Sequence, residues 1–314
     1  MLKEENDFVS GAKISSKFGI TRAAVWKKIE TLRKRGFSIA AVPSKGYKLI
    51  ESPDLSEEEI MMYVKGDFWK RIHLYKSLDS TNDIATSFAM KNMTDSGIVI
   101  IADSQNRGRG RLGRKWSSPP GVNIYMSIIL KPEIEPRDAT LITVLAAVAC
   151  AGALRKICGL EVMLKWPNDM MVADKKIAGI LTEVRSEPDR IKTAIIGVGI
   201  NVNIELKDFP EDIRCTATSV RQETGEYYSR SRIIIEILKE FENWYKIFIE
   251  KGRRPILEKW KQLSSTIGRN VRVTTAKEII SGIAEDIDDE GMLIIKLRSG
   301  RLRKISAGDI TVLR

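Results

Sequence analysis

The spacing of apolar residues near the start of the chain predicts two short helices. Residues 10–18 carry apolar side chains at helical spacing, residues 19–20 break the pattern, and Thr21 is a good N-cap for a second helix that runs to about Arg35. The second helix has one apolar stripe, formed by Val25, Ile29 and Leu32. We also expect Trp26 to pack inside the protein rather than to contact a ligand.

A hairpin is predicted directly after these helices. Residues 38–42 and 47–50 are typical of strands, and the Pro-Ser-Lys-Gly sequence between them is typical of a turn. Residues 51–59 are rich in acidic residues and contain Pro53, so we expect a linker that leads into a short helix. Two helices followed by a hairpin are the winged form of the helix-turn-helix motif.

The middle of the chain alternates short aliphatic runs with helical patterns. Strands are expected at 72–75, 97–102, 123–130, 176–183 and 195–200, and helices at 232–249 and around 257–263. The longest apolar stretch, residues 141–154, is shorter than the roughly 20 residues that a membrane-spanning helix needs. The pattern changes again near the end, where short strands separated by turns predict a small β-barrel, at 270–275, 278–285, 292–297 and 302–306.

Charge is concentrated in the first part of the chain. The protein has 314 residues and a net charge of +11, and its first 50 residues hold eleven Lys and Arg against four Asp and Glu. A basic winged helix is expected to bind DNA, with base contacts from the start of the second helix and a phosphate contact from the hairpin. The candidate residues are Thr21, Arg22, Lys27 and, on the wing, Lys45. The alternative is a protein-interaction module with a solvated basic face.

Composition excludes several classes of protein. No apolar segment follows the charged N-terminus, so no secretory signal is visible and a cytoplasmic location is expected. Cys150, Cys158 and Cys215 lack C-x-x-C spacing, which argues against disulfides and a zinc cluster, and we expect all three to be buried thiols. His73 is the only histidine, which makes a serine triad or a multi-histidine metal site difficult to build.

The run Gly-Arg-Gly-Arg-Leu-Gly-Arg-Lys-Trp at 108–116 is the most informative motif in the chain. Its cations suit carboxylate and phosphate oxygens, and its glycines let backbone approach a ligand closely. Such runs can also be flexible, solvated segments. Here two predicted strands flank the run, which favours an ordered anion-binding loop.

Three other segments carry polar groups that are meaningful only in combination. Residues 77–82 supply hydroxyl and amide groups that could simply cap a helix. Residues 163–169 end on Asn168 and Asp169. A turn at 174–175 places Lys176 at the start of a strand. The Gly-x-Gly sequence at 197–199 lacks the third small residue and the following helix of a dinucleotide-binding fingerprint, so a Rossmann site is rejected.

Together these segments resemble the biotin protein ligases in order and spacing, and the winged helix in front resembles the bifunctional members that also repress biotin genes. The resemblance implies an α+β fold in three domains. A winged helix-turn-helix would occupy residues 1–56. Residues 66–262 would form a mixed α/β ligase domain that is SH2-like and related to class II aminoacyl-tRNA synthetases, and residues 267–314 would form an SH3-like barrel.

The resemblance also implies a reaction and roles for residues. Biotin and ATP, with Mg²⁺, would form biotinyl-adenylate, and a lysine of a biotin carboxyl carrier domain would then take the biotin. The expected catalytic residues are Lys176, Arg111 and Asp169. The biotin site would comprise Ser80, Thr81, Asn82, Gln105, Arg109, Gly110, Arg111 and Lys176. The ATP site would comprise Arg114, Lys115, Trp116, Asn168 and Asn201, and no protein ligand to a metal is identified.

Some points stay open at the level of sequence. The segment 205–225 offers only Phe209 as an aromatic cover for adenine, where some family members use another aromatic residue. A lipoate-type ligase, or a ligand-sensing transcription factor without ligase activity, are the alternatives to a biotin ligase. A homodimer formed with the adenylate, operator DNA as partner and no membrane association are further expectations from the resemblance.

Overall fold

The computed structural model describes residues 1–5, 7–64, 66–91 and 95–313. These residues form two compact units, Met1–Ser56 and Glu57–Arg314. Each unit is described by itself.

The first unit contains two helices and a two-stranded antiparallel hairpin. Its elements are α1 (Gly11–Phe18), α2 (Arg22–Lys34), β1 (Ser38–Val42) and β2 (Gly46–Glu51). Ser10 caps α1 by accepting a hydrogen bond from the Lys13 amide, and Thr21 caps α2 by accepting one from the Ala24 amide at 3.2 Å. The predicted winged helix-turn-helix is confirmed.

The core of this unit comes from the apolar stripes. It is formed by Val9, Ile14, Val25, Ile29 and Ile39, with Leu32 packed against them. The prediction for Trp26 was wrong, because its side chain is 55% exposed. Trp26 directly follows Val25, which points into the core, so the helical period turns Trp26 toward solvent.

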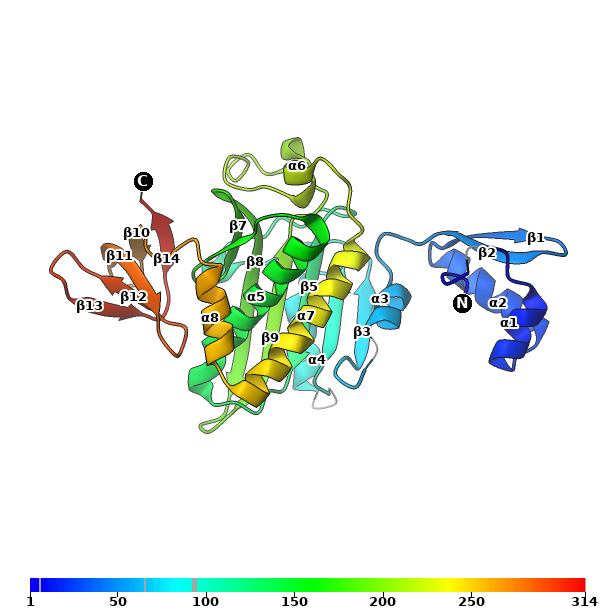
Figure 1. The fold of residues 1–314 in the computed structure, drawn as a ribbon, viewed down its shortest axis with the longest axis horizontal. Coiled ribbons are helices and arrows are strands. Elements are labelled where there is room, and N and C mark those ends of the chain that lie inside the picture. The colour runs from blue at the N-terminus through cyan, green and yellow to red at the C-terminus, as the bar shows by residue number, and fades with distance from the viewer. Residues whose placement is uncertain (6, 65, 92–94, 314) are drawn as a thin grey trace. The chain divides into compact units, whose positions relative to one another are not determined.

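The second unit is built around a seven-stranded mixed sheet (Figure 1) with the order β3-β4-β5-β9-β8-β7-β6. Only β3 and β4 pair in parallel. Its strands are β3 (Arg71–Tyr75), β4 (Ile98–Ala102), β5 (Ile124–Leu130), β6 (Met163–Lys165), β7 (Asp169–Val172), β8 (Lys175–Ser186) and β9 (Ile191–Ile200).

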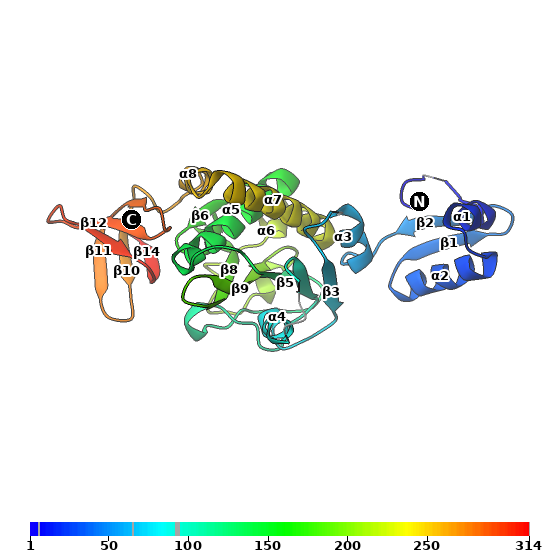
Figure 2. The same ribbon diagram turned by 90° about the horizontal axis from the view of Figure 1, so that it is seen from below.

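Helices cover both faces of this sheet. They are α3 (Glu57–Tyr63), α4 (Thr81–Met90), α5 (Ala139–Cys158), α6 (Val220–Thr224), α7 (Arg230–Lys251) and α8 (Arg254–Gln262), with single 3₁₀ turns at Arg111–Gly113, Pro136–Asp138 and Leu206–Asp208. Figure 2 shows α5, α7 and α8 on one side of the sheet and α4 on the other. The central strands β4 and β5 are therefore buried along their whole length.

Helix α5 is the apolar stretch that the sequence showed at 141–154. Pro136–Cys158 is long and apolar enough to cross a bilayer. No other helix in the described part of the chain meets this criterion. However, 72% of its most apolar window is buried inside the protein. It packs against α7 and the strands β8 and β9, as the central helix of a globular core does.

The C-terminal strands form a separate five-stranded antiparallel sheet with the order β13-β12-β11-β10-β14. The strands are β10 (Asn270–Thr274), β11 (Ile279–Ile287), β12 (Leu293–Lys296), β13 (Leu302–Ile305) and β14 (Asp309–Val312). The first four match the predicted strands, and β14 was not predicted. The winged helix, the mixed α/β region and the C-terminal β-rich region confirm the predicted fold class.

The cysteines differ from the sequence prediction in one case. Cys150 and Cys158 are buried, and burial raises the pKa of each thiol to about 12, so they are unreactive near neutral pH. Cys215 is exposed, which contradicts the expectation that all three are buried. It lies in the irregular segment between the turn at Leu206–Asp208 and α6, where no apolar periodicity fixes a side chain's direction.

Candidate active site

A cavity of about 430 Å³ lies between the hairpin at residues 108–116 and the strands β7, β8 and β9. This volume suits a small molecule. Every residue that the sequence predicted for biotin, ATP or catalysis lines it: Ser80, Thr81, Asn82, Gln105, Arg109, Gly110, Arg111, Arg114, Lys115, Trp116, Asn168, Asp169, Lys176 and Asn201. Segments that are far apart in the sequence thus meet at one cavity.

The glycine- and arginine-rich run folds into an ordered hairpin. The Gly110 amide donates to the Arg114 carbonyl at 2.7 Å, and the Trp116 amide donates to the Gly108 carbonyl at 2.9 Å. At position 108 a Cβ would lie 2.4 Å from the Trp116 carbonyl oxygen, so only glycine fits there. At the tip, Leu112 adopts a left-handed φ of 53° and is 73% exposed.

Trp116 lies flat against the middle of the sheet. A Cβ at position 199 would lie 2.6 Å from the indole ring, and one at position 179 would lie 3.3 Å from it. A third glycine, Gly197, leaves room for Asn82, because a Cβ there would lie 2.4 Å from Asn82 Oδ1. The Gly-x-Gly sequence of β9 therefore serves to admit two site residues onto a strand.

Lys176 is fixed from two sides. Its ammonium forms an ion pair with Asp169 Oδ1 at 2.5 Å, and it lies 5.4 Å from the centre of the Trp116 ring in a cation-π arrangement. The backbone of Lys176 also pairs with residues 216–218, its amide donating to the Thr216 carbonyl at 2.8 Å. The lysine ammonium is thus held inside the cavity next to a carboxylate.

Two further arginines of the hairpin contact other parts of the second unit. Arg111 donates to Asn168 Oδ1 at 3.1 Å and approaches the Gly308 carbonyl at 3.5 Å. Burial lowers the pKa of its guanidinium, yet arginine stays charged at neutral pH. Arg114 forms an ion pair with Asp309 at the start of β14. The tip of the hairpin therefore touches the C-terminal sheet.

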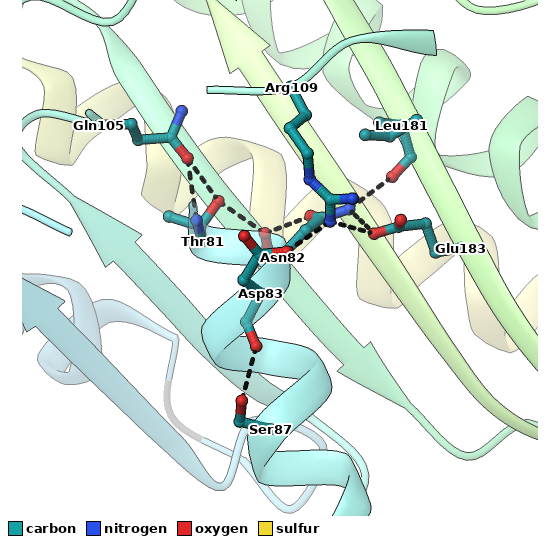
Figure 3. Close-up of polar contacts among 9 residues, drawn as sticks. Thr81, Asn82, Asp83, Ser87, Gln105, Arg109, Leu181 and Glu183 are labelled. Atoms are coloured by element: carbon teal, nitrogen blue, oxygen red, sulfur yellow. Dashed lines mark hydrogen bonds and ion pairs between the residues drawn. The ribbon is translucent and has the colours of Figure 1, made fainter. Parts of the chain in front are cut away.

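Neutral polar groups line the cavity where α4 begins, which we call its neutral end (Figure 3). Gln105 Oε1 accepts from the Thr81 amide at 2.9 Å, and Gln105 Nε2 donates to Ser118 Oγ at 2.9 Å. Ser80 stands at the N-cap of α4 but makes no side-chain capping hydrogen bond, although capping was the simplest expectation for it. Ser80 is among the residues that line the cavity.

The remaining wall is apolar. It contains Ile204, Phe209, Ile213 and Ala217, which pack on one another. Phe209 is 3% exposed, so it forms part of that cluster. Asn201 lies near this wall, and its side-chain amide donates to the Thr218 carbonyl at 3.0 Å. This hydrogen bond holds the segment after β9 against the start of α6.

The predicted DNA-contacting residues lie in the first unit. Arg22, Lys27 and Lys45 are exposed, as is Thr21. The Thr21 hydroxyl accepts the capping hydrogen bond from the Ala24 amide, which leaves its hydrogen and a second lone pair for a base.

Sequence reasoning missed several residues that complete the site. Asp309 comes from the C-terminal sheet, and Glu183, Ser118 and Ser127 each hydrogen bond to a predicted site residue. No spacing in the sequence marks them, because their partners lie on distant segments. Between residues 1 and 313, leaving out 6, 65 and 92–94, no group of three or more His, Cys, Asp or Glu side chains is placed to hold a metal ion.

Comparisons with known proteins agree with the geometry. Residues 74–201 match the model of the Biotin/lipoate A/B protein ligase family, residues 266–313 the Biotin protein ligase C terminal domain, and residues 1–48 an HTH domain. The Bifunctional ligase/repressor BirA of Bacillus subtilis is 41% identical over 97% of this chain and 94% of its own length. The Biotin--[acetyl-CoA-carboxylase] ligase of Mycobacterium tuberculosis is 32% identical over 83% of this chain and 97% of its own. The structure of the Aquifex aeolicus biotin protein ligase in complex with biotin and ATP superposes with a TM-score of 0.68 at 28% identity, covering 78% of this chain and all of that one.

Proposed function

This chain belongs to the biotin protein ligase family, and we propose that the cavity under its 108–116 hairpin is where biotin and ATP react. The protein is a ligase that uses ATP to attach biotin to a biotin carrier domain of a carboxylase, and it is also a DNA-binding repressor. The roles of individual residues below are proposals.

The reaction has two steps. The carboxylate of biotin attacks the α-phosphorus of ATP, pyrophosphate leaves, and biotinyl-5′-adenylate forms. The amine of a lysine on the carrier domain then attacks the acyl carbon and AMP leaves. The first step needs two anions in contact, so cations that face both of them lower the barrier electrostatically.

Lys176 supplies the central cation. Its ammonium stands beside Asp169 and over Trp116, and from there it reaches both the biotin carboxylate and the α-phosphate, where negative charge develops. Arg111, half-buried beside Asn168, assists at the same point. In the second step Asp169 orients the incoming lysine amine.

Biotin is recognised at the neutral end of the cavity. Its ureido ring lies against Ser80, Thr81, Asn82 and Gln105, and the backbone at Arg109 and Gly110 closes over it. Uncharged hydrogen-bonding groups suit a ring that carries no charge but two N–H donors and a carbonyl. A dithiolane ring has neither, which favours biotin over lipoate as the substrate.

ATP lies along the other half of the cavity. Arg114 and Lys115 contact its phosphates, Trp116, Asn168 and Asn201 stand around the nucleotide, and the apolar wall at Phe209 receives the adenine. Mg²⁺ enters with the nucleotide. Asp169, Asp174 and Asp309 line the cavity, but among the described residues no group of three or more His, Cys, Asp or Glu is placed to hold a metal ion, so a magnesium ion here would be held mainly by phosphates and water.

The first unit reads operator DNA. The exposed start of α2, with Arg22 and Lys27, enters a major groove, and Lys45 on the wing contacts a phosphate. A two-fold operator calls for two copies of this chain, so we propose a homodimer that forms when the adenylate is bound. A cytoplasmic location, away from membranes, fits the two activities.

The observation that carries the ligase proposal is the Lys176–Asp169 pair beneath an arginine-rich hairpin in a cavity of ligand size. The test is incubation of the full chain with biotin, ATP, Mg²⁺ and a purified carrier domain, followed by mass spectrometry of that domain. We expect a mass gain of one biotinyl group on a single lysine. An unchanged mass at saturating substrate would refute the proposal, and a gain only when lipoate replaces biotin would reassign the substrate.

The repressor proposal has its own test. A gel shift with DNA from upstream of biotin genes should show binding by the full chain when biotin and ATP are present. If the chain retards no such DNA, with or without biotin and ATP, the first unit is a protein-interaction module.

A further inference from the structure

Glu183 lies on β8, the strand of Lys176, and the sequence assigned it no role, yet its carboxylate joins two parts of the site (Figure 3). Its Oε2 accepts a hydrogen bond from Asn82 Nδ2 at 2.7 Å and from Arg109 Nη2 at 3.2 Å. Arg109 is also paired with Asp83 at 2.6 Å. One carboxylate oxygen therefore connects the neutral end of the cavity to the base of the hairpin.

The Glu183 carboxylate determines the orientation of the Asn82 side-chain amide. The edge of the amide that faces Glu183 also faces the Leu181 carbonyl, 3.3 Å away. Both neighbours only accept hydrogen bonds, so this edge must be the NH₂ group. The amide oxygen is then the atom that lies 2.6 Å from Ser127 Oγ.

The hydrogens along the rest of the chain follow from this orientation. An amide oxygen has no hydrogen, so the single hydrogen of the Ser127 hydroxyl goes to Asn82. Ser127 Oγ lies 2.7 Å from Thr81 Oγ1, and with its own hydrogen used it can only accept there. Thr81 therefore donates its hydroxyl hydrogen to Ser127. The other acceptor within reach of that hydrogen, Gln105 Oε1, is farther away, at 3.2 Å from Thr81 Oγ1.

What Thr81 has left for the cavity is the lone pairs of its hydroxyl oxygen. Gln105 Oε1 is already an acceptor, because the Thr81 backbone amide donates to it at 2.9 Å. We propose that Glu183 is a positioning residue for biotin: by orienting Asn82 it fixes the direction of the hydrogen-bond chain so that Thr81 presents an acceptor to a ureido N–H. This proposal rests on the proposed function and adds to it a residue that selects for N–H donors on the substrate ring.

The first test measures binding of biotin and of ATP separately, by calorimetry on the full chain and by the KM of each in pyrophosphate release. In Glu183→Ala the buried Asn82 NH₂ group loses its shorter acceptor and keeps only the Leu181 carbonyl, 3.3 Å away, so the orientation of the amide is held less firmly. We expect biotin binding to weaken about tenfold, with the affinity for ATP unchanged. In Glu183→Gln the side-chain carbonyl still accepts from Asn82, so this variant should fall between the wild type and Glu183→Ala.

A matched control comes from the residue that directly follows the same strand. Glu187 forms ion pairs with Arg190 and Lys192 outside the cavity. Glu187→Gln removes an equal charge and should leave the affinity for biotin at the wild-type value. Should Glu183→Ala fail to fold, Glu183→Met keeps the volume of the side chain while removing the acceptor, and takes its place.

Two further measurements separate positioning from a general structural role. If Glu183 acts through Asn82, then Glu183→Ala should add little to the loss already caused by Asn82→Ala, as a double-mutant cycle would show. The wild type should also prefer biotin over an analogue in which one ring N–H is replaced by oxygen, and Glu183→Ala should lose much of that preference.

The outcomes are distinct from those that test the ligase activity. A wild-type chain that does not bind biotin refutes the proposed function. A wild-type chain that does bind it, together with a Glu183→Ala variant of equal affinity, overturns only the role of Glu183. An equal loss of affinity for biotin and ATP, or additive losses in the cycle, would likewise overturn it.

Discussion

Lys176, the proposed catalytic cation, shows how a single charge is held in place within the cavity. The Asp169 carboxylate 2.5 Å away and the Trp116 ring hold the ammonium inside the cavity, where little has to reorganise when an anion binds. Pre-oriented charges of this kind stabilise a transition state more than they stabilise bound substrate.

Lys176→Ala should therefore keep the fold but lower the rate of adenylate formation by roughly a hundredfold or more, the loss typical of one pre-oriented electrostatic contact. Pyrophosphate release under single-turnover conditions measures that rate, with circular dichroism as the check on folding. A near-normal rate in a folded variant would remove Lys176 from the chemistry.

Arg111 differs from Lys176 because it belongs to the hairpin rather than to the sheet. Its guanidinium donates to Asn168 and lies close to the Gly308 carbonyl, so it holds the hairpin over the cavity in addition to its proposed contact with the substrates. Arg111→Gly removes both effects. We expect the adenylate to form but to leave the protein faster, which a filter assay of retained radiolabelled adenylate would detect. Equal retention by variant and wild type would contradict this role.

At the scale of elements, α2 shows how helical periodicity separates buried from exposed positions. Val25 and Ile29 are buried as the stripe requires, whereas Trp26, one position along, presents its ring to solvent beside Lys27. Since the exposed start of α2 is the proposed DNA-reading surface, this ring lies where it can contact base edges or sugars.

Trp26→Ala should then weaken operator binding about tenfold, the cost of one good contact to a base, without affecting folding. Because tryptophan is uncharged, the slope of log K against log salt should stay constant. In contrast, Lys45→Ala should reduce that slope by about one unit, as the loss of one phosphate contact does. Fluorescence anisotropy at a series of salt concentrations measures both. A change of slope for Trp26→Ala, or no loss of affinity, would exclude a base or sugar contact.

The C-terminal sheet gives a second example at this scale. Its first four strands follow from alternating apolar residues and turn signals, but β14 is four residues long and pairs with β10, which lies more than 30 residues earlier. That pairing is tertiary, so a local pattern does not reveal it. It places Asp309 where it pairs with Arg114 of the hairpin.

At the scale of the whole molecule, the two activities make one combined prediction. If the adenylate favours a dimer, sedimentation velocity should show a larger species with biotin and ATP than with either alone, and operator affinity should rise under the same condition. Lys176→Ala, which makes little adenylate, should show neither change. Equal operator binding with and without both substrates would show that DNA binding does not depend on formation of the adenylate.

The sequence by itself determined the elements and the kind of chemistry. Periodicity and capping residues gave α1 and α2, aliphatic runs gave β4 and β5, and the clustered cations and glycines predicted an anion site. These features are local, because hydrogen bonding along a helix, alternation along a strand and glycine's freedom depend on neighbours in the chain. The family resemblance then assigned residues to biotin and to ATP.

Only the tertiary structure decided how the segments meet. It laid Trp116 on Gly199 and placed Glu183 between Asn82 and Arg109. Each of these depends on residues that are far apart in the sequence and come together through the pairing order of the sheet. Since a hydrogen-bond partner is chosen by distance and direction in space, the sequence could name the groups of the site, whereas the fold alone chose their partners.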